Sequence, residues 1–191
     1  MAFLWQALRL FILGVASCLA HQVHAALSTI SLGYSMHSGA ETDSIAGASS
    51  YHIVLGAEST PGALRISSGI EGHYGAGLVS WGAEVFDATR MGGELKLGLS
   101  LHLFSDATMR PILGVNGLAA LDLVRSSVPP EGLSTSQTAT GFGYEIECGM
   151  GITASANSEL RLLGVYKKLK MKLVERDIVV DAFALRLGLA Y

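Results

Sequence analysis

The chain has 191 residues, of which 15% are charged, and its formal net charge is −3. This share of charged residues is below the roughly 25% of an average soluble protein, while the mean hydropathy is +0.42. A net negative charge argues against a nucleic-acid-binding surface, and beyond residue 25 no apolar run approaches the ~20 residues that a membrane helix needs. High hydropathy without such a run is typical of a membrane β-barrel, in which apolar and polar residues alternate.

The first 25 residues have the organisation of a cleaved secretory signal peptide. An apolar stretch at 10–20 is followed by the small-x-small ending that signal peptidases prefer, which finishes at Ala25. We expect cleavage after Ala25, so that 26–191 forms the mature chain. Cleavage after Ala20 is one alternative, and a lipoprotein-type box that would leave Cys18 acylated is another.

Eight segments of the mature chain alternate apolar and polar residues, which indicates β-strands with one apolar face. They lie at about 28–37, 50–58, 63–74, 94–103, 111–123, 142–153, 159–168 and 183–191. The fourth segment has the clearest pattern, because leucine occupies every second position from Leu95 to Leu103. An even number of strands suits a closed antiparallel barrel whose two termini lie at the same end.

The last segment carries large apolar residues at every second position and finishes on an aromatic residue. These residues are Phe183, Leu185, Leu187, Leu189 and Tyr191. Such a strand resembles the C-terminal assembly signal of bacterial outer-membrane barrels. The resemblance implies that the barrel-assembly machinery is a partner.

The connections between the segments alternate in predicted length. Those after the second, fourth and sixth segments are short, whereas the others are longer, at about 39–49, 75–92, 124–140 and 169–177. Short periplasmic turns and longer extracellular loops alternate in this way in outer-membrane barrels.

A soluble eight-stranded barrel such as a lipocalin is the structural rival. In a soluble barrel the apolar face points inward and the charged face meets water. Here the polar face is rich in glycine, which suits the crowded inside of a narrow barrel, and the apolar face carries no charge. A lipid-facing surface must exclude charge, because Arg or Lys at the bilayer midplane costs roughly 2–4 kcal/mol. The sequence therefore favours an all-β, eight-stranded, up-and-down transmembrane barrel.

Two motifs support a family resemblance. Arg110 to Gly117 and Gly141 to Tyr144 are similar to the Pro-aromatic-x-Gly and Gly-aromatic-Gly-Tyr strand openings of small outer-membrane barrels of the OmpA/OmpX/opacity-protein type, although Ile112 replaces the usual aromatic. The resemblance covers essentially the whole mature chain. It implies a location in the bacterial outer membrane, with both mature termini in the periplasm and with membrane lipid and lipopolysaccharide as surroundings.

The predicted inward face mixes acids and bases, which indicates a plug of ion pairs and hydrogen bonds. Its charged residues are Arg65, Glu71, Glu94, Lys96, Asp122, Glu145, Glu147, Arg161 and Arg186. Eight strands leave space mainly for side chains, so we expect a filled lumen. A narrow gated channel is the alternative interpretation.

Three histidines are expected near the extracellular mouth of the lumen: His37, His52 and His73. They are a candidate site for Zn²⁺ or Cu²⁺ or for a proton-sensitive latch. Their spacing does not define a ligand set, so we expect ordinary polar lumen groups and no cofactor. His102 belongs to the other end of the barrel.

The predicted function is a structural or surface-interaction role, with an extracellular ligand bound through the loops as one possibility. Transport of small solutes or hydrophobic molecules through a narrow channel is the alternative, and a lipid-modifying enzyme is a third class. Lipid A deacylase barrels use a late-strand His-x-Ser pair, and no histidine follows His102. The loops are neither strongly basic nor aromatic, so the sequence does not identify a ligand.

Overall fold

A computed structural model describes residues 27–38, 44–59, 62–81, 84–104, 107–126, 135–155, 158–174 and 176–191. The predicted signal peptide, 1–25, lies outside these residues. No helix within the described ranges is long and apolar enough to cross a membrane.

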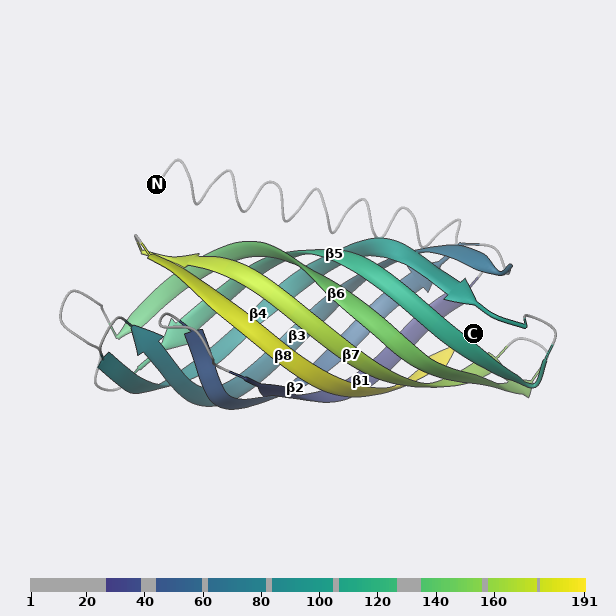
Figure 1. The fold of residues 1–191 in the computed structure, drawn as a ribbon, viewed down its shortest axis with the longest axis horizontal. Coiled ribbons are helices and arrows are strands. Elements are labelled where there is room, and N and C mark those ends of the chain that lie inside the picture. Colours follow the sequence, from purple (N-terminus) through teal and green to yellow (C-terminus); the bar gives the residue numbers. More distant parts are fainter. Residues whose placement is uncertain are drawn as a thin grey trace.

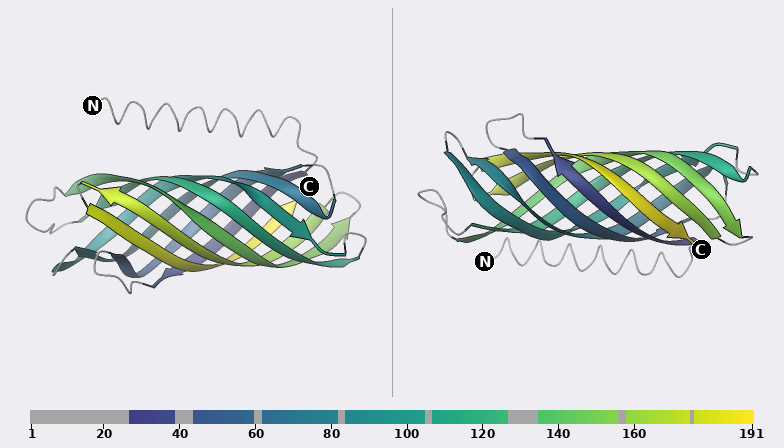
Figure 2. Two further views of the ribbon diagram at one scale, coloured as in Figure 1. Left: turned by 45° about the horizontal axis from the view of Figure 1, so that its top comes forward. Right: turned by 90° about the horizontal axis from the view of Figure 1, so that it is seen from below.

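The described chain is a ring of eight tilted antiparallel strands (Figure 1). The strands are β1 (Leu27–His37), β2 (Ser44–Glu58), β3 (Leu64–Trp81), β4 (Glu84–His102), β5 (Met109–Arg125), β6 (Ser136–Ser155), β7 (Ser158–Leu173) and β8 (Arg176–Ala190). Each strand pairs with the next along the chain, and β8 pairs with β1 to close the barrel. Figure 2 shows the same ring from two further directions, with hairpins at both ends. The predicted all-β, eight-stranded, up-and-down fold is confirmed.

The closure joins the two ends of the described chain. Thr29 lies opposite Ala190 and His37 opposite Ala182, and the backbone groups of Ser28 and Tyr191 exchange two hydrogen bonds, of 2.7 and 2.9 Å. We call this end of the barrel, where β1 begins and β8 ends, the terminal end. The other end, which carries the β1–β2, β3–β4, β5–β6 and β7–β8 connections, is called the far end.

The strands at the far end are longer than the sequence analysis predicted, and the predicted alternation of loop lengths was wrong. Segment 75–92 is not a loop but the two arms of the β3–β4 hairpin, which stay in register from Gly75 opposite Arg90 to Trp81 opposite Glu84. Most of 169–177 likewise belongs to β7 and β8. The cause is that the sequence pattern changes in these arms. Their apolar residues lie on the inward face, so these parts of the strands cannot be recognised by an apolar outward face.

The outward face carries an apolar belt around the barrel. Its exposed side chains include, one from each strand, Leu32, Ile53, Ile66, Leu97, Val115, Ile146, Leu162 and Leu187. No charged side chain of the described residues points outward within this belt, because alternation along each strand turns the belt's acids and bases inward.

Near the far end the polarity of the two faces is reversed, and we call this part of the barrel the far section. Its inward face forms a buried apolar cluster that includes Val79, Ala88, Val124, Ala139, Leu169, Met171, Leu173, Ile178 and Val180. Its outward face carries every outward charge of the described side chains, namely Asp87, Arg125, Lys168, Lys170, Lys172, Asp177 and Asp181. The far section therefore has the polarity of a soluble barrel, and the belt section has the opposite polarity.

Candidate functional site inside the barrel

The nine charged residues predicted for the lumen all lie on inward faces of the strands. Eight of them are buried, and the Glu147 side chain is 16% exposed. The period of two along each strand places them there, and the closed ring brings together residues that are distant in sequence. They contribute to three groups of ion pairs along the barrel axis.

Arg186 of β8 lies at the centre of the first group. Its Nη2 donates to Glu71 Oε2 at 2.8 Å and to Glu145 Oε2 at 2.5 Å, and its Nη1 donates to Glu147 Oε1 at 2.6 Å. Its Nε donates to His52 Nε2 at 3.3 Å. The planar guanidinium therefore uses all three of its nitrogens, which suits the fork geometry of arginine.

Two lysines complete this group. Lys96 Nζ lies 2.7 Å from Glu71 Oε2 and 2.7 Å from Glu145 Oε2. Lys167 Nζ lies 2.6 Å from Glu71 Oε1 and 2.6 Å from Glu94 Oε2. The set of three cations and four carboxylates is called the central cluster; its members are Glu71, Glu94, Lys96, Glu145, Glu147, Lys167 and Arg186.

A second group, the terminal cluster, fills the barrel near its terminal end. Glu58 accepts from Arg65 at 3.0 Å and from two nitrogens of Arg161 at 2.6 and 2.8 Å. Arg161 also donates to Glu159 at 2.7 Å, and Arg110 lies 3.3 Å from Glu159. The bidentate contact between Arg161 and Glu58 joins strands β7 and β2, which are separated in the ring by β8 and β1.

A third group lies between the central cluster and the far section. Arg90 Nε donates to Asp122 Oδ2, and Asp122 Oδ1 also lies 3.1 Å from His73 Nε2. Arg90 Nη2 lies 3.6 Å from Glu94 Oε1, which links this pair to the central cluster.

The inward charges of the described side chains are balanced. Seven carboxylates (Glu58, Glu71, Glu94, Asp122, Glu145, Glu147 and Glu159) meet seven cations (Arg65, Arg90, Lys96, Arg110, Arg161, Lys167 and Arg186). Five of these residues were not among those predicted for the lumen, namely Glu58, Arg90, Arg110, Glu159 and Lys167. The strand period would have placed four of them inward, whereas Arg90 belonged to a segment predicted to be a loop.

Little free space remains among these side chains. The cavity that reaches Lys96, Glu147, Arg161 and Arg186 has a volume of about 70 Å³. Two further cavities beside His37 hold about 10 Å³ each. A single water needs about 10–15 Å³, so these spaces accommodate a few waters.

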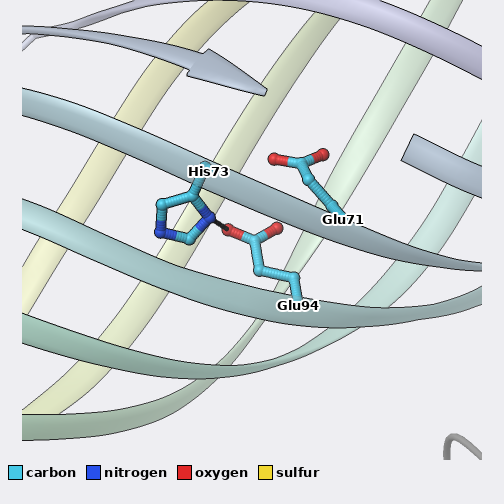
Figure 3. A group of neighbouring side chains, drawn as sticks. All are labelled: Glu71, His73 and Glu94. Carbon is cyan, nitrogen blue, oxygen red and sulfur yellow. Dashed lines mark ion pairs between the residues drawn. The ribbon is translucent and has the colours of Figure 1, made fainter. Parts of the chain in front are cut away.

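The three predicted histidines are all buried, but they do not form a shared ligand set. His37 Nε2 lies 3.1 Å from Ser50 Oγ, and His52 contacts Arg186. The group with metal-ligand spacing among the described residues is instead Glu71, His73 and Glu94, whose ligand atoms lie within 4.8 Å of one another. Figure 3 shows the His73 ring facing the Glu94 carboxylate, with Glu71 beside them.

That group already holds a cation from the protein itself. Lys167 Nζ bridges Glu71 Oε1 and Glu94 Oε2 at 2.6 Å each, and Arg90 approaches the other oxygen of Glu94. A divalent ion would have to displace the ammonium group and withstand the repulsion of the neighbouring cations. The arrangement is therefore one of internal ion pairs.

Two serine–histidine pairs lie in the barrel interior, which bears on the enzyme alternative. Ser50 contacts His37 at 3.1 Å and Ser100 contacts His102 at 3.3 Å. A catalytic base needs its second nitrogen oriented by a third group, yet Nδ1 of both histidines has no hydrogen-bond partner among the described residues. All four side chains are also buried within the barrel, away from its lipid-facing surface.

The comparisons with known proteins agree with this architecture. No protein-family model matches the chain, and no curated protein matches it. The crystal structure of Neisserial surface protein A (NspA) is similar, with 13% identity over 86% of this chain and 94% of that chain and a TM-score of 0.64. The N-terminal β-barrel domain of Pseudomonas aeruginosa OprF has 9% identity over 87% of this chain and 98% of that chain, with a TM-score of 0.50. At these identities the likeness confirms the predicted resemblance to small outer-membrane barrels at the level of the fold.

Proposed function

We propose that this chain is a small outer-membrane β-barrel with a structural or surface-interaction role and a non-conducting interior. In this proposal a cleaved signal peptide directs export, the terminal end faces the periplasm, and the far section stands outside the membrane. The observation that carries the proposal is the reversal of polarity between the belt and the far section.

The belt supports insertion in a bilayer. Segment 183–191 exposes a large apolar side chain at every second position, and its length matches the roughly 9–11 residues that a tilted transmembrane strand needs. The ring is closed, so no strand of the described chain leaves an unpaired edge in the lipid. A soluble barrel would need its charges on this outer face, whereas the belt's charges point inward.

The interior supports a non-conducting barrel. Seven cations and seven carboxylates pair with one another within the ring, and the cavity that reaches Lys96, Glu147, Arg161 and Arg186 holds about 70 Å³. The far section adds a buried apolar layer across the same path. Narrow apolar constrictions exclude water and therefore ions.

A surface role is supported by the far section and by the similarity to a surface protein. NspA is named as a Neisserial surface protein, and the far section would expose a charged surface to the outside. We propose lipopolysaccharide and outer-membrane lipid as surroundings, assembly through the strand that ends at Tyr191, and an extracellular ligand on the far end. No cofactor, nucleic acid or catalytic step is part of the proposal.

The test is to refold the mature chain into lipid vesicles and to measure insertion and conductance separately. Insertion is read from protection of the strands against protease and from the heat-dependent mobility of the folded barrel on a gel. Conductance is read in a planar bilayer. We expect full insertion without discrete current steps.

The two outcomes that contradict the proposal are distinct. Regular current steps from the inserted wild-type chain would show a channel, with Lys96, Arg161 and Arg186 among its pore-lining residues. A chain that folds in water and leaves the vesicles untouched would show a soluble barrel.

A further inference from the structure

Three lysines project outward from β7 immediately beyond the apolar belt. The belt ends on this side of the barrel at an aromatic group in which the rings of Tyr166 and Phe183 lie 5.0 Å apart. Lys168, Lys170 and Lys172 follow at every second position, so all three share the outward face of one strand.

Their distances from the belt differ in a way that strand geometry predicts. A strand rises about 3.4 Å per residue and tilts by about 40° in a small barrel, so each lysine lies about 5 Å further from the belt than the one before. The headgroup layer on one side of a bilayer is about 5–7 Å thick. Lys168 therefore lies in that layer, Lys170 can extend its long side chain back into it, and Lys172 lies about 15 Å beyond Tyr166.

Lys168 and Lys170 each lie near an acidic side chain. Lys170 Nζ lies 2.8 Å from Asp177 Oδ2, but the two side chains are 67% and 53% exposed. Lys168 Nζ is 3.7 Å from Asp181 Oδ2, and Asp181 also accepts a hydrogen bond from the Tyr166 hydroxyl at 3.1 Å. The exposed pair of Lys170 and Asp177 contributes little to stability, so a multiply charged anion can compete with Asp177 for Lys170.

We propose that Lys168 and Lys170 bind the phosphate groups of lipid A, the anionic glycolipid anchor of lipopolysaccharide. Lysine is a common phosphate ligand, and cations next to a bilayer are attracted to its anionic headgroups. On the described outward face the lysines are concentrated on β7, so the site lies on one wall of the barrel. The proposal rests on the proposed function, because it requires the belt to lie in the membrane with the far section outside.

The experiment measures the affinity of the folded barrel in detergent micelles for purified diphosphoryl lipid A. Lys168→Gln and Lys170→Gln are compared with Lys172→Gln, a matched control that removes the same charge further from the belt. We expect each of the first two to weaken binding about fivefold, the order of effect of one cation near an anionic lipid surface, and the control to change it less than twofold. Asp177→Asn, which frees Lys170, should strengthen binding.

Several outcomes would overturn the inference. Equal affinity of all three lysine variants would show a general charge effect, and an equal response to inorganic phosphate would show that the lipid is not required. Weaker binding by Asp177→Asn would point to a bridging cation in place of direct lysine contacts. Insertion of the wild type into vesicles is measured in parallel, so that a failure of the proposed function is recognised separately.

Discussion

Glu147 differs from the other carboxylates of the central cluster. It is the most exposed of the four and lines the 70 Å³ cavity. Glu145, by contrast, is fully buried and accepts from Lys96, Asn116 and Arg186. The central cluster contains four carboxylates and three cations, so one negative charge is in excess. This charge costs least on the carboxylate nearest to water, because burial of an unpaired charge is unfavourable.

We therefore predict that two isosteric substitutions, Glu147→Gln and Glu145→Gln, change the free energy of unfolding by different amounts. Glu147→Gln should change the free energy of unfolding by less than about 1 kcal/mol, because it removes the excess charge. Glu145→Gln should cost about 3 kcal/mol, because Lys96 and Arg186 lose the fully buried carboxylate that both of them contact. Urea unfolding in lipid vesicles measures both. Equal losses would contradict the assignment of Glu147 as the excess charge.

At the scale of the element, β7 and β8 show where the barrel changes its surroundings. In β7 the outward side chains within the belt are Leu160, Leu162 and Tyr166, and three lysines follow beyond the belt. The inward side chains change from charged, at Arg161, to apolar, at Leu169. β8 changes at the same height, since Leu169 lies opposite Val180 and Tyr166 opposite Phe183. The two neighbouring strands therefore change the polarity of both faces at the same level of the barrel, as the proposed edge of the membrane requires.

Cys148 provides a direct test of this boundary. It points outward from β6 within the belt, opposite Leu113 of β5 and Gly164 of β7. In vesicles we expect it to resist a membrane-impermeant maleimide, whereas Lys172→Cys in a Cys148→Ser background should react. Both positions should react after unfolding in detergent and urea. Rapid labelling of Cys148 in the folded, inserted barrel would place the belt outside the lipid.

At the scale of the whole molecule, two different layers of inward side chains lie in series along the barrel axis. The ion-pair clusters occupy the section inside the belt, and the apolar layer occupies the far section. Leu169 and Val180 form a cross-strand pair in that layer, and both are fully buried. If the interior is non-conducting as proposed, each section should stop ions by itself, the first because its charges are mutually paired and the second because its side chains are apolar.

Opening a path should therefore require changes in both sections. We predict no conductance from Leu169→Ser with Val180→Ser, and none from Glu145→Ser with Arg186→Ser, which removes one charge of each sign. The fourfold variant should give discrete current steps in a planar bilayer. Circular dichroism and gel mobility confirm that each variant folds. Steps from either pair alone would mean that the other section is not a barrier.

The periodicity of the sequence determined much of this protein without reference to tertiary structure. It predicted eight strands, assigned their apolar and polar faces, and selected nine charged residues that all lie on inward faces in the structure. These inferences needed only the sequence, because side-chain alternation is a local property of a strand and the apolar and charged residues occupy alternate positions.

Tertiary structure decided the remainder. Arg161 meets Glu58 although the two are 103 positions apart in the sequence, and Lys167, not a metal ion, bridges Glu71 and Glu94. The hairpin within 75–92 also became evident only when its strands were paired. Periodicity gives the face of a residue but not its height along the barrel or its partner across it, because both depend on register and closure of the whole ring.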